Sequence, residues 1–464
     1  MGAAPSSAEA FEARLDRELG VAGGLTSKEL AKRALETSFD LSARQQELLA
    51  AAAQADRALL GYLPELTAAA SYTRLSDLGT ENLGNVVVAP GEPQGPLPAN
   101  VQLANFPIEI RGVLNQWVLQ ANLLVPVSDY FLRVAPSRNA AEHAERAAAS
   151  NVETARARVA TDARVAYYSW VRAELSIAVA EQALEDARAH LADTRVAVQA
   201  GSASTADLLR LESQVARSEL FLVSTRSLAA VAEEQVRTQL HATSDQPLAI
   251  AEDVREASTD RSLASQVARL PELVRLAYRD RPELKALNDN ASSLSLQARV
   301  ERAGYAPRLD ALAGATYANP NPRQFPPRDE FRSTWQVGVR LSWNITDIAS
   351  ARLRARSTEA RSAAVLSDRS ALADRIRVEV RSAAQSVDDS HIALETTQRS
   401  QDAAEESYRV RRLQYQNGRA SNVELLDAET DLTRARLERL NAEVDARVAQ
   451  VRLDYAVGRA NAHR

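Results

Sequence analysis

The 464-residue sequence contains no cysteine, and this absence excludes several kinds of site at once. Without a thiol the chain forms no disulfide and no thiolate metal site, and it has no cysteine to carry an N-terminal lipid. Its five histidines are scattered, with no pair at metal-binding spacing, so we expect no metal. A glycine-rich phosphate loop and a nucleophile elbow are also missing, and we therefore expect neither a cofactor nor an enzyme.

Long apolar runs and an excess of one charge are missing as well. No stretch approaches the roughly 20 apolar residues that a membrane-spanning helix needs. Basic and acidic residues are interspersed, 56 against 61, and the net charge of −5 predicts no binding to nucleic acid. Residues 1–20 lack the basic start and apolar middle of a signal peptide, so we interpret the sequence as a mature, processed chain behind a start methionine.

What the sequence does contain is a duplication. Distinctive residues of the first half recur in the same order in the second half. The corresponding pairs are Tyr62 and Tyr305, Pro64 and Pro307, Trp117 and Trp335, Gly201 and Gly418, and Ser204 and Ser421. Such a repeat predicts two copies of one folding unit, with an insertion in the first copy between Leu66 and Trp117.

Four segments alternate between apolar and polar residues, two in each copy. Residues 335–343 are the clearest case, because every second residue from Trp335 to Trp343 is tryptophan, valine or leucine. The other segments are 66–73, 117–125 and 309–317. Alternation with a period of two predicts four strands in two hairpins, which we assign to 64–128 and 305–346. Tips rich in glycine, proline and asparagine are expected at 75–110 and 318–330.

Helical patterns occupy most of the remaining chain. Each strand hairpin leads into a long helical hairpin, at 129–241 and at 347–457, and a glycine ends the outgoing helix of each. Shorter helices are expected at the equator, over 27–63 with Ser27 as N-cap and over 271–304. The small, polar residues 1–26 predict a loose N-terminal arm, and the polar residues 242–270 predict a linker between the copies.

The strand that begins and ends with tryptophan suggests a membrane. Trp335 and Trp343 are separated by roughly 26 Å in an extended strand, which matches the apolar band and aromatic girdles of an outer-membrane barrel. With Trp117 they are the candidate girdle residues. Four strands close no barrel, and open edges do not survive in hydrocarbon, so several chains must each donate a four-stranded panel.

The two turns between long helices have the same spacing. A glycine is followed three residues later by serine, then by an acid three further on and by two leucines. The two sets are Gly201, Ser204, Asp207, Leu208 and Leu209, and Gly418, Ser421, Glu424, Leu425 and Leu426. Glycine favours the left-handed end of a helix, and each serine with its acid predicts a capping box. Capping by itself is a sufficient explanation of both acids.

The chain resembles the TolC-type outer-membrane efflux proteins, which are also called the outer membrane factor family. The resemblance lies in this order of elements and extends from about Ser27 to Val457. Residues 415–418, followed by Ser421, Glu424 and Asp427, are similar to the tip of that family's second repeat. The resemblance implies a mainly α fold with a four-stranded β panel, internally duplicated. It also implies a homotrimer whose twelve strands form one transmembrane β-barrel, continued by a long α-helical tunnel.

The resemblance also implies roles for residues at the turns. Acids that match Glu424 and Asp427 form the family's aperture and set its ion selectivity. Its closing network uses a tyrosine that matches Tyr415 and an acid that matches Asp207. Arg419 stands one position before the basic residue of the family's well-studied member, and it is the candidate for the third part of this latch.

The function implied is that of a passive exit duct in the outer membrane of a Gram-negative bacterium, with a periplasmic helical extension. It would serve a tripartite efflux or type I secretion system, in contact with outer-membrane lipid. Its partners would be a periplasmic adaptor (membrane fusion protein) and an inner-membrane transporter of RND, ABC or MFS type. The adaptor would engage the two turns, where Leu208, Leu209, Leu425 and Leu426 would offer grooves.

Two other classes of protein fit part of the pattern. A soluble coiled-coil scaffold would use the same helices but leaves the tryptophan-bounded strand unexplained. A secreted or periplasmic binding module would use residues 75–110 as a recognition loop.

Overall fold

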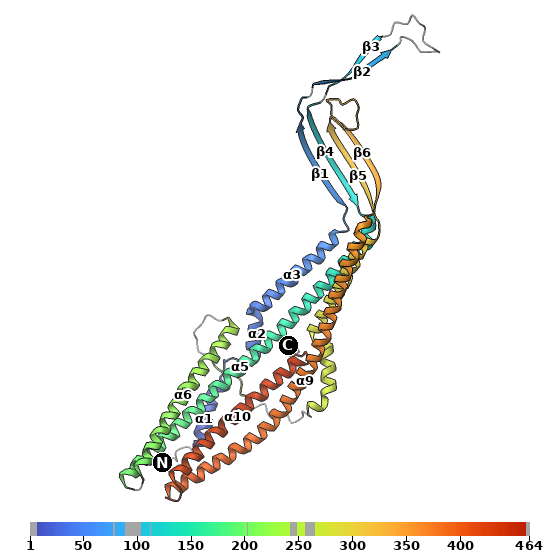
Figure 1. The fold of residues 1–464 in the computed structure, drawn as a ribbon. Coiled ribbons are helices and arrows are strands. Elements are labelled where there is room, and N and C mark those ends of the chain that lie inside the picture. Colours follow the sequence, from blue (N-terminus) through green and yellow to red (C-terminus); the bar gives the residue numbers. More distant parts are fainter. Residues whose placement is uncertain are drawn as a thin grey trace. The chain divides into compact units, whose positions relative to one another are not determined.

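The computed structural model describes residues 7–77, 79–88, 104–111, 113–201, 203–241, 248–255 and 265–460. The chain forms two compact units (Figure 1). The first comprises Met1–Ala50, Glu145–Asn290 and Ala364–Arg464, and the second comprises Ala51–Ala144 and Ala291–Ala363.

Two helical hairpins form the framework of the first unit. One consists of α5 (Ala135–Gln199) and α6 (Thr205–Leu240), the other of α9 (Ile345–Gln416) and α10 (Asn422–Ala456), and these bounds confirm the long helices that the sequence predicts. The helices lie lengthwise in the order α6, α5, α10, α9 (Figure 1). Ion pairs join neighbours along this row, from Arg188 to Glu219, from Arg172 to Asp445 and from Arg436 to Glu405.

The described residues also form several shorter α-helices. They are α1 (Ser7–Glu18), α2 (Ser27–Thr37), α3 (Phe39–Leu60), α4 (Val127–Asp129), α7 (Leu270–Asp280) and α8 (Pro282–Arg302). A π-helical turn, Tyr130–Val134, joins α4 to α5, and 3₁₀ turns at Val267–Arg269 and Ala303–Tyr305 precede α7 and follow α8.

The main core of the first unit contains a cluster of aromatic side chains on α5. Tyr167 and Trp170 are fully buried there. The Tyr167 hydroxyl donates to the carbonyl of Leu25 at 2.9 Å, and the Tyr168 hydroxyl donates to Glu252 at 2.7 Å. Burial raises the pKa of the Tyr168 hydroxyl to about 12, so this group stays protonated and able to donate. The aromatic cluster therefore fastens residues 25 and 252 to α5.

The predicted loose arm at 1–26 is wrong, because α1 is part of this core. Phe11 and Leu15 lie on one face of α1, Leu19 directly follows its end, and all three side chains are at most 5% exposed. The guanidinium of Arg436 lies 4.5 Å from the centre of the Phe11 ring, a cation–π contact. Their spacing of four residues, with mostly charged residues between them, was the available signal for an amphipathic helix.

The start of α2 also differs from the prediction. Thr26, and not Ser27, is the N-cap, since its hydroxyl accepts a hydrogen bond from the backbone N–H of Glu29 at 3.1 Å. Ser27 is buried in the first turn, and its hydroxyl lies 3.1 Å from that of Tyr168. Two adjacent hydroxyl residues compete for one cap position, and packing against α5 decides between them.

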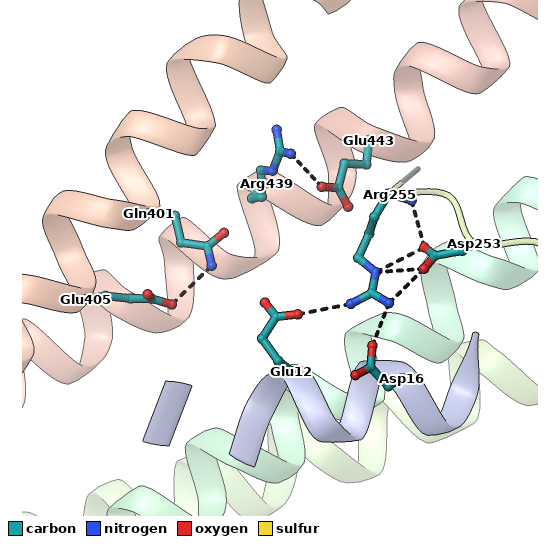
Figure 2. Close-up of polar contacts among 8 residues, drawn as sticks. All are labelled: Glu12, Asp16, Asp253, Arg255, Gln401, Glu405, Arg439 and Glu443. Carbon is teal, nitrogen blue, oxygen red and sulfur yellow. Dashed lines mark hydrogen bonds and ion pairs between the residues drawn. The ribbon is translucent and has the colours of Figure 1, made fainter. Parts of the chain in front are cut away.

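Part of the predicted linker at 242–270 is packed as well. Ile250 and Val254 are buried in the same core, and Ile250 pairs with Leu25 in a short parallel bridge. Arg255 binds Asp253 and reaches across to Glu12 and Asp16 of α1, as Figure 2 shows. These contacts raise the pKa of Arg255 and hold α1 against residues 253–255 by charge as well as by apolar burial.

A four-stranded antiparallel sheet, in the order β1-β4-β5-β6, dominates the second unit. The strands are β1 (Glu65–Arg74), β4 (Asn115–Val125), β5 (Arg308–Asn319) and β6 (Arg332–Ser342). The predicted four strands in two hairpins are thus confirmed, and pairing of β4 with β5 joins the hairpins. The outer edges of β1 and β6 have no strand partner in the described chain.

The predicted loop at 75–110 contains a second hairpin. Strands β2 (Thr80–Val88) and β3 (Ala104–Arg111) form their own two-stranded sheet. The run of valines at 86–88 and the alternation of Phe106, Ile108 and Ile110 were the signals for it. The turn-rich segment Pro90–Pro98 lies outside the described residues.

We predict that Phe11→Ala destabilises the first unit by about 3 kcal/mol or more, because it removes a buried ring and leaves a cavity below Arg436. Thermal unfolding and hydrogen exchange along α1 measure the effect. Arg17→Ala on the exposed face of α1 is the matched control and should change little. Equal exchange in the two variants would contradict the packing of α1.

Candidate functional site

One face of the four-stranded sheet is apolar and open. The register places Leu66 opposite Leu123, Leu119 opposite Tyr317, and Leu309 opposite Leu341, so apolar residues of all four strands share that face. On β6 the exposed fractions are 73% for Trp335, 69% for Val337, 72% for Val339 and 69% for Leu341. An exposed apolar face of this extent marks contact with a membrane or with another protein.

The opposite face of the same sheet is polar. Gln120 pairs with Thr316, Asn122 with Gly314, and Asp310 with Arg340, all on that face. Two apolar pairs, Leu124 with Leu312 and Val118 with Ala318, also lie on this face, so the two faces differ in polarity without a strict alternation at every residue.

The three candidate girdle tryptophans are all exposed. The ring of Trp117 lies 4.4 Å from that of Tyr72 on β1, and Trp335 lies on the apolar face of β6. Trp343 follows the end of β6, and its indole N–H donates to the carbonyl of Tyr305 at 3.3 Å. Their position in a membrane stays a prediction.

The turn between α5 and α6 contains the predicted capping box. Gly201 has a φ of 74°, in the left-handed region. The hydroxyl of Ser204 accepts from the N–H of Asp207 at 3.2 Å and donates to the Asp207 carboxylate at 2.6 Å. The hydrogen bond from Ser204 is the main reason that the pKa of Asp207 lies below its ordinary value.

The turn between α9 and α10 repeats this geometry. Gly418 has a φ of 69°, and Ser421 caps α10 through the N–H of Glu424 at 3.3 Å. The Glu424 carboxylate accepts from the backbone N–H of Ser421 at 2.8 Å, and this bond is the main reason that its pKa is lowered. Arg411 also lies 3.2 Å from this carboxylate. Both capping boxes are confirmed, and Glu424 and Asp427 are exposed.

The three predicted latch residues are not brought together within one chain. The Tyr415 hydroxyl lies 3.1 Å from that of Thr194 on α5, and Asp207 is held by its own cap. The guanidinium of Arg419 forms no hydrogen bond or ion pair with any described residue. Sequence reasoning missed Thr194 and its neighbours on α5, since nothing local singles out one polar residue of a long helix.

The four leucines of the turns differ in exposure. Leu209 is 60% exposed, and Leu208 is half-buried. Leu425 and Leu426 are 3% and 9% exposed, so the prediction that they offer a groove is wrong. Leu425 packs with Tyr408, Ala428 and Leu432 between α9 and α10. The repeat predicts equivalent positions, but helix packing buries only the second pair.

Two searches of the described residues found no further site. No three histidine, cysteine, aspartate or glutamate side chains among them are placed to hold a metal ion. The helices within the described ranges include none that is both long and apolar enough to span a bilayer.

A family model described as "Outer membrane efflux protein" matches residues 30–240 and 273–459, more than half of the chain. The chain belongs to this family. Members of the outer membrane efflux protein family are outer-membrane channels and passive ducts, not enzymes, and the predicted resemblance is confirmed.

Solved structures agree with this membership in their fold. The outer-membrane channel OprN is 18% identical, with a TM-score of 0.71 over 95% of this chain and 94% of that chain. VceC of Vibrio cholerae is 16% identical, with a TM-score of 0.72 over 98% and 99%. The CmeC channel of Campylobacter jejuni is 14% identical, with a TM-score of 0.71 over 96% and 91%. No curated protein matches the chain.

We predict that Ser204→Ala weakens the start of α6 by about 1 kcal/mol, because the cap hydroxyl is lost. Hydrogen exchange of the first turn of α6 measures this. Ser227→Ala on the same helix is the control, since its hydroxyl donates to the carbonyl of Val223 and caps nothing.

The same variant should change the response to acid. Because the pKa of Asp207 is lowered in the folded chain, its stabilisation is present above the unfolded pKa and is lost as pH falls through the lowered value. Ser204→Ala should reduce that acid dependence. An unchanged pH profile would contradict the role of the hydrogen bond.

Proposed function

We propose that this chain is the subunit of a homotrimeric exit duct of the outer membrane. Three four-stranded panels would form one twelve-stranded transmembrane barrel, and the helical hairpins would form a periplasmic tunnel that continues it. Membership in the outer membrane efflux protein family supports this role. The observation that carries it is the four-stranded sheet, with one apolar face, one polar face and two free edges.

The free edges of the four-stranded sheet would be paired by further copies of the chain. β1 and β6 each present one row of backbone N–H and C=O groups that no described strand satisfies. Each such group costs several kcal/mol in hydrocarbon, so a panel in lipid requires partners on both sides. If β6 of one copy pairs with β1 of the next, the contact is head-to-tail and closes a ring.

The helical unit supports the same arrangement. α6 and α9 lie at the two ends of the row of four helices, and both carry exposed apolar side chains. These are Leu220, Val223 and Leu228 on α6, and Val378, Ile392 and Leu413 on α9. In a ring, α6 of one copy would cover α9 of the next and remove these residues from water.

The two faces of the panel fit two media. The apolar face would contact lipid, with Trp117, Trp335 and Trp343 at its borders, and the polar face with Gln120, Asn122 and Arg340 would line water. A soluble coiled-coil scaffold would have to leave the entire apolar face in water, so this alternative is disfavoured by the exposure of Val337 and Leu341.

The turns would form the periplasmic end of the duct. Three copies of Glu424 and Asp427 around one axis would concentrate negative potential and favour cations. Tyr415, Asp207 and Arg419 would meet between neighbouring copies to close the aperture. A periplasmic adaptor would bind near Leu208 and Leu209, and an inner-membrane pump would supply the cargo of a tripartite efflux or type I secretion system.

Placing an arginine on the apolar face tests residence in the membrane. We predict that Leu119→Arg reduces assembly into the outer membrane, because a cation on the lipid face costs about 2–4 kcal/mol near the midplane. Membrane fractionation and the mass of the detergent-solubilised particle are the measurements, and the unaltered chain should give three copies.

Gln120→Arg is the matched control, because it is the next residue of β4 on the polar face. It should assemble as the unaltered chain does. If the unaltered chain is a monomer that stays soluble without detergent, the proposal is refuted. If the two arginine variants have equal effects, the assignment of one sheet face to lipid and the other to water is refuted.

Replacing Glu424 and Asp427 together with alanine tests the aperture. We predict that the double variant loses much of its preference for cations, because the ring of charge disappears. Reversal potentials of single channels in a salt gradient measure this preference. Glu438→Ala, an exposed acid further along α10, is the control and should not change it. Unchanged selectivity in the double variant would exclude these acids from the aperture.

A further inference from the structure

A long groove of the first unit is lined by every lysine of the chain. Only three of the 56 basic residues are lysines, namely Lys28, Lys32 and Lys285. Lys28 and Lys32 line a cavity of about 640 Å³ between α2, α3 and α5, and Lys285 lines an adjoining cavity of about 660 Å³ at the start of α8. Gln45 of α3 and Arg156 of α5 line both cavities, which therefore form one groove. We call it the lysine groove.

Helix α5 forms the floor of the lysine groove. Its residues Ala149, Arg156, Ala160 and Arg164 line the groove from one face of the helix, since they follow one another at spacings of seven, four and four residues. From Ala149 to Arg164 the helix rises about 22 Å, so the groove is elongated. The wall formed by α2 and α3 is partly apolar. Its leucines are Leu35, Leu41 and Leu48.

The lysine groove carries positive charge that the described chain does not neutralise. All three lysines are exposed, and none forms a hydrogen bond or ion pair with a described residue. Nε of Arg164 is buried and has no hydrogen-bond partner. Three of the four acids that line the groove are already paired with arginines, and the fourth is Glu36. The ion pairs are Arg156 with Glu153, Arg279 with Asp280, and Arg281 with Glu283.

The use of lysine at these positions is a second signal. Arginine supplies nearly all other positive charge in this chain, so three lysines along one groove stand apart from its general composition. An ammonium group is a compact charge on a flexible stem, whereas a guanidinium is a rigid planar fork. Lysines on the two walls can therefore adjust to carboxylates that lie at varying positions along a flexible ligand.

We propose that the lysine groove binds an extended acidic peptide segment of a partner protein. Carboxylates of the peptide pair with Lys28 and Lys32 at one end and with Lys285 at the other, and its apolar side chains contact the leucines of the wall. Six extended residues span about 20 Å, which matches the length of the floor, whereas a small anion reaches only one end. A carboxylated oligosaccharide lacks apolar side chains for the leucines, so the peptide is favoured.

The lysine groove is separate from the turns at which we propose that the adaptor binds. About 50 Å of helix lies between Arg164 and Gln199, the last residue of α5. All residues of the groove belong to the first unit of one chain, so binding of the peptide requires neither a trimer nor conduction. A partner held in the groove leaves Leu208 and Leu209 accessible to the adaptor.

The scarcity of lysine allows a direct measurement on the full chain in a neutral detergent. Reductive methylation with carbon-13 formaldehyde labels the three lysines and the N-terminal amine, and it keeps their charge. Single replacements of each lysine by arginine assign the NMR signals. The probe is a six-residue peptide of alternating glutamate and leucine. We expect saturable shifts of all three lysine signals, and no shift with the same peptide carrying glutamine in place of glutamate.

Charge reversal tests each end of the groove. Lys32→Glu and Lys285→Glu should each weaken binding of a fluorescent form of the peptide about tenfold, because repulsion replaces attraction. Arg33→Glu is the matched control, since Arg33 is the exposed neighbour of Lys32 on α2 and does not line the groove. It should weaken binding roughly twofold at most. Fluorescence anisotropy at constant ionic strength measures the three affinities, and added salt should weaken binding to the unaltered chain.

The proposal is overturned if the unaltered chain does not bind the peptide, or if neither lysine reversal weakens binding. An effect of only one reversal would contradict an extended ligand, and equal affinity for hexagalacturonate would contradict a peptide. A chain that forms no trimer but binds the peptide would refute the duct and leave the lysine groove intact. A conducting trimer that does not bind the peptide would do the reverse.

Discussion

The hydrogen bonding of a four-stranded sheet is the constraint on which the rest of this structure depends. β4 and β5 satisfy each other and their outer neighbours, but β1 and β6 each leave one edge open. The same sheet exposes an apolar face to its surroundings. In an apolar medium the apolar face is stable, but the open edges are not stable for a single copy, because unpaired backbone groups cannot be hydrated there. Under the proposed function, the need for neighbouring copies would follow from backbone chemistry before any side chain at the edges is considered.

The helical hairpins use polar side chains in two different ways. At the turns, Ser204 with Asp207 and Ser421 with Glu424 satisfy the free N–H groups of a helix start, at positions open to water. These bonds also fix the direction of the two acids, so the charge of Glu424, which is proposed for the aperture, would be held in place beforehand. Further into the bundle, Nδ1 of His190 lies 3.3 Å from Oε1 of Glu429, where both side chains are almost fully buried.

Sequence patterns predicted the elements that depend on local geometry. Alternation from Trp335 to Trp343 predicted β6, and the spacing from Gly418 to Glu424 predicted a helix end and a capping box. The elements that the sequence analysis did not predict also have local signals, but these signals are weak. Phe11, Leu15 and Leu19 stand among charged residues before a glycine-rich stretch, and Val86–Val88 stand beside a proline-rich stretch. The role of the duplicated turns as an aperture remains a proposal that rests on family resemblance.

By itself the sequence determined the four strands of the main sheet, the long helices, the glycine turns and the different polarity of the two sheet faces. These follow from repeat distances of two and about 3.6 residues, which the backbone imposes on every chain. Only the tertiary structure decided that Leu425 is buried while its counterpart Leu208 is half-buried, and that His190 meets Glu429. Burial and pairing of this kind depend on which helices pack together, and that choice is made by contacts between residues far apart in the chain.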